Sequence, residues 1–271
     1  MPRFLFGERD LRLISGMFKN AFRLPFKLLG IPVQLDVSFL LVLPLFAWLI
    51  GNNIEVYVEI LRLKIEPEVL KEGYAPYLVG LVSALGLFGS VLIHELGHCV
   101  VGRYYRLEIV SITLWLLGGM AQFKRMPKRG GVEAVVAIAG PVTSFAVAGV
   151  CWVLLQLTPV TIVPLHFVLA YLVWMNVVLA TFNLLPALPL DGGRVLRSLL
   201  ALRSNHLKAT LGAAALSRVI ALGMGLVGLM TGHIFLLLIA FFVFMAGMAE
   251  SQMAMAADLL RGIHVLSLIH I

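Results

Sequence analysis

Long apolar runs separated by short polar segments make up most of the chain. Six of them are interpreted as membrane-spanning segments, at residues 37–50, 77–101, 132–157, 160–185, 211–230 and 234–248. A helix of about 20 residues crosses roughly 30 Å of hydrocarbon. The first run is short and contains Pro44. Arg218 interrupts the fifth and the sixth is short, so a single broken helix is the alternative for that pair.

A different pattern occupies residues 107–123, between the second and third runs. Val110, Ile112, Leu114 and Leu116 alternate with other residues before Gly118-Gly119. A period of two with β-branched residues predicts a strand, and the glycine pair a turn or bulge. An amphipathic surface loop is the alternative. The predicted fold class is an all-α polytopic membrane protein of about six transmembrane helices, with a small membrane-associated strand element between the second and third.

Composition supports a membrane protein. Of the 271 residues, 61% are hydrophobic and 13% charged, and the mean hydropathy is +0.99. Soluble domains average about 25% charged residues. The net charge of +7 needs no nucleic-acid partner, because the basic residues lie where membrane topology would place them. Both cysteines, Cys99 and Cys151, lie in apolar runs, so no disulfide framework is indicated.

The distribution of Lys and Arg predicts the orientation. With a cytosolic N-terminus, the inside segments 1–36, 102–133, 191–218 and 249–271 hold 6, 6, 5 and 1 of them, which makes 18 of 21. The outside loop 51–77 holds the other 3 together with five glutamates. This asymmetry follows the positive-inside rule. Both termini are therefore expected in the cytosol of a multi-pass protein of the cell membrane.

Four regions are expected along the chain. Residues 1–36 mix basic and apolar side chains, as in an amphipathic segment on an anionic membrane surface, and show no cleavable signal peptide. Residues 37–200 form a transmembrane core, and residues 201–264 the C-terminal transmembrane helices. Residues 265–271 end without a polar tail and are doubtful as native sequence.

The second apolar run contains His94-Glu95-Leu96-Gly97-His98. Residues four apart share one face of a helix, so both imidazoles can bind one zinc ion while Glu95 acts on a water molecule. Ionisable residues inside a membrane are costly and indicate a functional site. The alternative is a pair of hydrogen-bonded core histidines.

A hydrolytic zinc site needs a third protein ligand. His166 and His233 lie near the outer ends of their runs, and Cys99 points about 100° away from His98 on a helix. Cys151 is a further candidate, and Glu95 is assigned the role of base rather than of ligand. Asp191 is the preferred third ligand, because the fourth run brings it to the same depth as the two histidines, near the cytosolic face.

Asp191 ends the segment Asn183-Leu-Leu-Pro-Ala-Leu-Pro-Leu-Asp191, which precedes Gly192-Gly193. Its prolines stop a helix and its glycines allow close approach, so a broken stretch is expected to turn Asp191 inward. Asn183 is a candidate for hydrogen bonding to a substrate carbonyl or an oxyanion. Alternatively, Asp191 caps a helix starting near Gly192, Asn183 serves packing, and Asn176 is structural.

These motifs, with Gly118-Gly119 and Ala139-Gly140-Pro141, make residues 31–200 resemble the site-2 protease family of intramembrane zinc metalloproteases, in its archaeal and bacterial branch. The resemblance implies that His94, His98 and Asp191 bind one Zn²⁺ per chain. It also implies that Glu95 is the catalytic acid and base and that the transmembrane core 37–200 is the catalytic part of the chain.

The expected function is regulated intramembrane proteolysis, in which a peptide bond in or near a transmembrane segment of a membrane-protein substrate is hydrolysed. The strand element at 107–123 is expected to bind an unwound substrate by strand addition. A membrane metal transporter and an inactive membrane scaffold are the alternatives. The sequence names no substrate and no oligomeric state.

Overall fold

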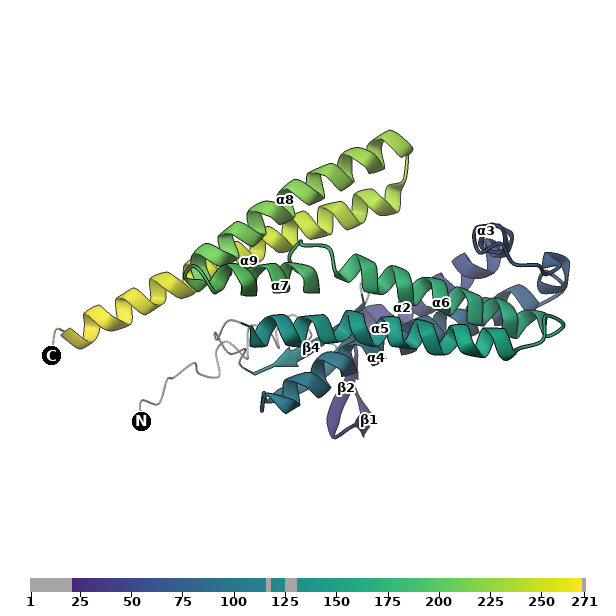
Figure 1. The fold of residues 1–271 in the computed structure, drawn as a ribbon, viewed down its shortest axis with the longest axis horizontal. Helices are drawn as coiled ribbons and strands as arrows, with labels where there is room; N and C mark the ends of the chain where they lie inside the picture. The colour runs from purple at the N-terminus through teal and green to yellow at the C-terminus, as the bar shows by residue number, and fades with distance from the viewer. Residues whose placement is uncertain (1–20, 116–117, 125–130, 270–271) are drawn as a thin grey trace. The chain divides into compact units, whose positions relative to one another are not determined.

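The described part of the chain is mostly helical and contains a small sheet (Figure 1). A computed structural model describes residues 21–115, 118–124 and 131–269. In chain order the elements are β1 (Phe22–Leu28), β2 (Ile31–Leu35), α2 (Val37–Asn52), α3 (Ile54–Ile60), the 3₁₀ helix η1 (Pro67–Leu70), α4 (Ala75–Tyr104), β3 (Ile109–Trp115), β4 (Gly118–Phe123), α5 (Val132–Leu157), α6 (Val163–Asn183), α7 (Asp191–Ala201), α8 (His206–Thr231) and α9 (Ile234–Ile269).

The chain divides into two compact units. The first comprises Met1–Met126 and Val142–Val178, and the second Pro127–Pro141 and Leu179–Ile271. The division passes through α5 at Pro141, a proline inside that helix. The first unit therefore contains the sheet, α4 and most of α5, whereas the second contains α7, α8 and α9.

Within the described residues, five helices are long and apolar enough to cross a membrane: α4, α5, α6, α8 and α9 as far as Leu259. The consecutive helices α2 and α3 bend by 69° and give a sixth span if they are counted as one. This confirms the predicted class, a multi-pass membrane protein of about six spans.

The fifth and sixth apolar runs form two helices, so the single broken helix is wrong. α8 ends at Gly232, whose φ of 71° is the left-handed conformation that commonly terminates helices. α9 then runs beside α8 (Figure 1) and continues well beyond the predicted end of the sixth run. The added part, residues 249–269, is rich in Ala, Met and Leu, which favour helix whether or not they lie in lipid.

The predicted strand element is confirmed as β3 and β4, which pair antiparallel, with Trp115 opposite Gly118. They belong to a four-stranded sheet of order β1-β2-β3-β4, in which β2 and β3 are parallel. β4 is thus an edge strand of this sheet. Ile31, Cys99 and Ile112 form one buried cluster, which packs the sheet against the part of α4 that carries the histidine motif.

The strands β1 and β2 were not predicted. They form a hairpin whose two-residue turn, Leu29-Gly30, has φ angles of 50° and 75°, as a type I′ turn requires. Proline disfavours the interior of central strands but is tolerated at sheet edges and near strand starts. Pro25 lies in the edge strand β1, and Pro32 is the second residue of β2. Of the predicted amphipathic segment 1–36, residues 1–20 lie outside the described residues, as do Leu116 and the last two residues of the tail.

The core of the first unit lies between α2, α4 and α6. α2 and α4 approach so closely that a Cβ atom on Gly80 would lie 2.1 Å from the carbonyl oxygen of Ala47. A Cβ on Gly51 would lie 2.7 Å from the carbonyl oxygen of Pro76. Small residues allow this backbone contact between helices, as is common in membranes. The contact fixes the helix that carries His94 and His98.

Replacing Gly80 by alanine should destabilise the first unit, because the new methyl group would meet backbone atoms of α2, which cannot rotate away. Overpacking of this kind costs roughly 1–3 kcal/mol. We expect a lower thermal unfolding midpoint in detergent for Gly80→Ala. Gly89→Ala, on the same helix, is the control, because a Cβ at Gly89 would meet nothing within 4 Å. Equal midpoints for the two variants would contradict this packing.

Candidate metal centre

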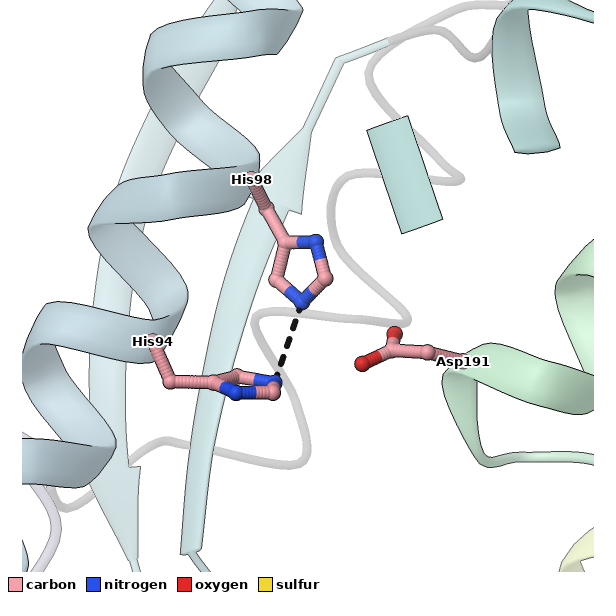
Figure 2. Close-up of side chains that lie close together, drawn as sticks. All are labelled: His94, His98 and Asp191. Atoms are coloured by element: carbon pink, nitrogen blue, oxygen red, sulfur yellow. Dashed lines mark hydrogen bonds between the residues drawn. The ribbon is translucent and has the colours of Figure 1, made fainter. Parts of the chain in front are cut away.

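His94 and His98 project from one side of α4, one helical turn apart (Figure 2). Both side chains are buried, with exposures of 3% and 5%. Their Nε2 atoms lie 3.2 Å apart. Two ligands of a tetrahedral zinc ion, each about 2.0–2.1 Å from the metal, are roughly 3.3 Å from each other. The two imidazoles are therefore spaced as ligands of one ion would be.

Asp191 is the third potential ligand (Figure 2). One ligand atom from each of His94, His98 and Asp191 lies within 4.8 Å of the other two, and all three residues are buried. Two imidazole nitrogens and a carboxylate oxygen are a donor set that zinc takes in hydrolases, where a fourth position stays open. The chemistry of the residues present thus fits the implied Zn²⁺.

No other group of three or more potential ligands occurs among the described residues. Cys99, Cys151, His166 and His233 therefore belong to no such cluster. Cys99 has an exposure of 0% and packs with Ile31 and Ile112, which explains its burial without a ligand role.

Asp191 is the first residue of α7, and Leu190 occupies the N-cap position without a capping side-chain hydrogen bond. The helix considered in the alternative interpretation therefore exists, but Asp191 is inside it rather than at its cap. A carboxylate in the first turn is stabilised by the positive end of the helix dipole.

The glycines after Asp191 explain how the chain delivers this carboxylate. A Cβ on Gly192 would lie 2.2 Å from the carbonyl oxygen of Leu184, and one on Gly193 would lie 2.3 Å from the amide nitrogen of Leu188. The first turn of α7 therefore packs directly on the backbone of the preceding loop. That loop is tied to α8 where the Leu188 N–H donates to Ser217 Oγ at 2.6 Å.

α7 is also held by partly buried ion pairs. Arg197 donates to Glu133 at the start of α5 and, at 2.9 Å, to Glu250 of α9. Burial lowers the pKa of the Arg197 guanidinium, but the negative charges of Glu133 and then Glu250 outweigh it and raise that pKa above its usual value. This network connects α7 and α9 with the first residues of α5, all within the second unit.

Glu95 lies between the two histidines in sequence and is 9% exposed. Its Oε2 accepts a hydrogen bond of 2.9 Å from the N–H of Ala121 in β4. The strand approaches so closely that a Cβ on Gly119 would lie 2.6 Å from Glu95 Cγ. The glycine expected to make a turn or bulge instead gives Glu95 room beside β4.

Asn183 ends α6, is half-buried, and its Nδ2 donates to the carbonyl of Leu179 in the same helix. Its catalytic role stays a prediction. Asn176 is fully buried, and its Nδ2 donates to Ser90 Oγ and to the Leu172 carbonyl, as expected of a residue that joins helices.

One contact of His94 was not predicted from the sequence. Its Nδ1 lies 2.8 Å from Ser144 Oγ in α5. Serine is ordinary in membrane helices, and only its position three residues after Ala139-Gly140-Pro141 could have drawn notice.

Comparisons with known proteins agree on one family. The family model described as Peptidase family M50 matches residues 82–163 and 158–226. A protein of Methanocaldococcus jannaschii, "Zinc metalloprotease MJ0392", is 33% identical over 240 residues, which cover 88% of this chain and 63% of that protein. "Putative zinc metalloprotease sll0528" of Synechocystis is 36% identical over 187 residues, or 69% of this chain and 46% of that one. This chain thus spans about half to two thirds of the length of these relatives.

A solved structure, "Site-2 Protease from Methanocaldococcus jannaschii", matches with a TM-score of 0.58 and 32% identity. The match covers 85% of this chain and 95% of that one. The likeness therefore extends over the fold as well as the motifs.

Replacing Asp191 by alanine should remove the metal, because two imidazoles alone leave a zinc site incomplete. We expect about one zinc per chain in purified wild type by elemental analysis, and little in Asp191→Ala. Asp258→Ala removes an exposed carboxylate of α9 and should keep its zinc. Full zinc content in Asp191→Ala would exclude it as an essential ligand.

Proposed function

Because the chain belongs to peptidase family M50, the site-2 protease type of zinc metalloprotease, we propose that it hydrolyses a peptide bond in or near a transmembrane segment of a membrane-protein substrate. The observation that carries the proposal is the grouping of His94, His98 and Asp191 within 4.8 Å, with buried Glu95 on the same helix as the histidines. In this proposal the three grouped residues bind the ion and Glu95 is the acid and base.

Bound zinc would supply Lewis acidity toward a water molecule and the scissile carbonyl. Glu95 takes the proton of the attacking water and then gives it to the leaving amine nitrogen. The Ala121 N–H holds one oxygen of the carboxylate by a hydrogen bond. This bond fixes the orientation of Glu95 before substrate arrives, which lowers the entropic part of the activation free energy.

The substrate segment must be locally unwound, because the carbonyls of a helix are occupied by its own hydrogen bonds. We propose that β4 receives the unwound segment by strand addition. Two observations support this: β4 is an edge strand of the sheet, and its Ala121 N–H faces Glu95 rather than β3. A segment along that edge would lie next to the catalytic carboxylate.

The proposed orientation has both termini in the cytosol and the site near the cytosolic face. It is supported by the 18 basic residues on the segments assigned to the inside, against 3 in the outer loop. Regulated intramembrane proteolysis is the biological process that such an enzyme would serve. The bilayer and a membrane-protein substrate with a transmembrane segment are its proposed partners.

Replacing Glu95 by glutamine should abolish cleavage while leaving zinc in place, because the amide keeps the size of the side chain but accepts no proton. The assay is cleavage of a panel of fluorogenic transmembrane peptides in liposomes by zinc-loaded protein. Glu59→Gln, an exposed position on α3, is the control and should cut like wild type. Normal cleavage by Glu95→Gln would refute the assignment of Glu95 as the base. Absence of cleavage by wild type would refute the proposed protease activity.

Replacing Gly119 by alanine should lower kcat by roughly 100-fold, because the new methyl group displaces Glu95 and misplacement of a catalytic group by about 1 Å costs this much. Zinc content should not change, since the atoms nearest to a Cβ on Gly119 belong to Glu95 and Val91 rather than to a proposed ligand. Gly149→Ala on α5, where a Cβ meets nothing within 4 Å, is the control. An unchanged kcat would show that β4 does not position the base.

A further inference from the structure

Ser144 and His94 form a buried pair within the first unit. Ser144 Oγ lies 2.8 Å from His94 Nδ1, with exposures of 0% for the serine and 3% for the histidine. The other ring nitrogen of His94, Nε2, lies 3.2 Å from the Nε2 of His98. The two nitrogens of one imidazole thus face two different partners, a hydroxyl and the proposed metal site.

Zinc binding through Nε2 would fix the tautomer of His94. A neutral imidazole carries one proton, and a nitrogen that binds a metal must present its lone pair. If Nε2 of His94 binds the ion, the proton is on Nδ1, and the N–H there donates to Ser144 Oγ. Partners of this kind orient the ring and raise the basicity of the ligating nitrogen.

We propose that Ser144 is a positioning residue that holds His94 in the tautomer and orientation for binding zinc. The inference rests on the proposed metal site and adds to it a residue from α5. A hydroxyl suits this place, because its oxygen accepts a hydrogen bond from the Nδ1–H without adding another charge to an apolar helix, where an unpaired carboxylate would be costly.

A serine beside a histidine is also the arrangement of a nucleophile and its base. Two observations argue against that role here. Ser144 has an exposure of 0%, so its oxygen has no surface open to a substrate carbonyl. The second nitrogen of His94 faces another imidazole of the ligand group rather than a separate orienting residue.

The test is the zinc affinity of purified full-length protein, measured by competition with a chromogenic chelator. Ser144→Ala should bind zinc 10- to 100-fold more weakly than wild type, which is the usual loss when the hydrogen-bond partner of a ligating histidine is removed. Ser144→Thr keeps the hydroxyl and should restore most of the affinity. Ser83→Ala is the matched control, because Ser83 is also a buried serine but its Oγ has no partner among the described residues.

A second measurement separates positioning from folding. The zinc-free unfolding midpoint of Ser144→Ala reports what it costs the fold to remove the hydroxyl beside His94 Nδ1, and it should fall slightly. The rise in midpoint on adding zinc reports binding alone, and it should be smaller than in wild type, because the stabilisation by a ligand grows with the ratio of its concentration to Kd. A variant that folds normally and binds zinc like wild type overturns the inference and leaves the metal site intact.

Two further outcomes would also overturn it. If Ser144→Ala loses cleavage but keeps wild-type zinc affinity, Ser144 acts in the reaction as a nucleophile or proton carrier and not through His94. If wild type itself binds no zinc, the proposed metal site fails and this inference fails with it.

Discussion

Two imidazoles and a carboxylate lie on one turn of α4, a helix that is otherwise mostly apolar. The cost of removing these groups from water constrains the elements packed around them. A buried polar group without a partner costs about 1–3 kcal/mol, and more if it is charged. His94 is met by Ser144 from α5, and Glu95 by the Ala121 amide from β4. The sheet and α5 thus have an electrostatic reason to pack against α4.

A similar constraint operates in the second unit. Arg197 is largely buried, and its charge is balanced by two glutamates from other helices. Pairs of this kind stabilise a fold only weakly overall, but losing one partner is expensive because the other charge stays buried. α7 therefore has few alternative positions. Its first turn, which begins at Asp191, also packs closely against the backbone of the preceding loop at Gly192 and Gly193.

The sequence was informative where a pattern repeats over many residues or where chemistry is rare. The run 132–157 became α5 with the same bounds, and the alternation after residue 107 became β3 and β4. An HExxH motif inside an apolar run is costly unless its polar groups bind a metal or one another, so it points to a site. In contrast, the hairpin of β1 and β2 depends on pairing with β3, a strand about 80 residues later, which no local pattern reveals. The roles of Ser144 and Ala121 were equally hidden, since one is a common helix residue and the other acts only through its backbone.

The hydrogen bond between β4 and Glu95 has a consequence for how the resting state could be observed. Most amides in a sheet are protected from isotope exchange by backbone carbonyls, so their exchange reports the opening of strands. The Ala121 amide is instead protected by a side-chain carboxylate. Its exchange rate therefore reports how often the Glu95 carboxylate breaks this hydrogen bond. Isotope exchange at this one amide would measure the mobility of the proposed base in the resting protein.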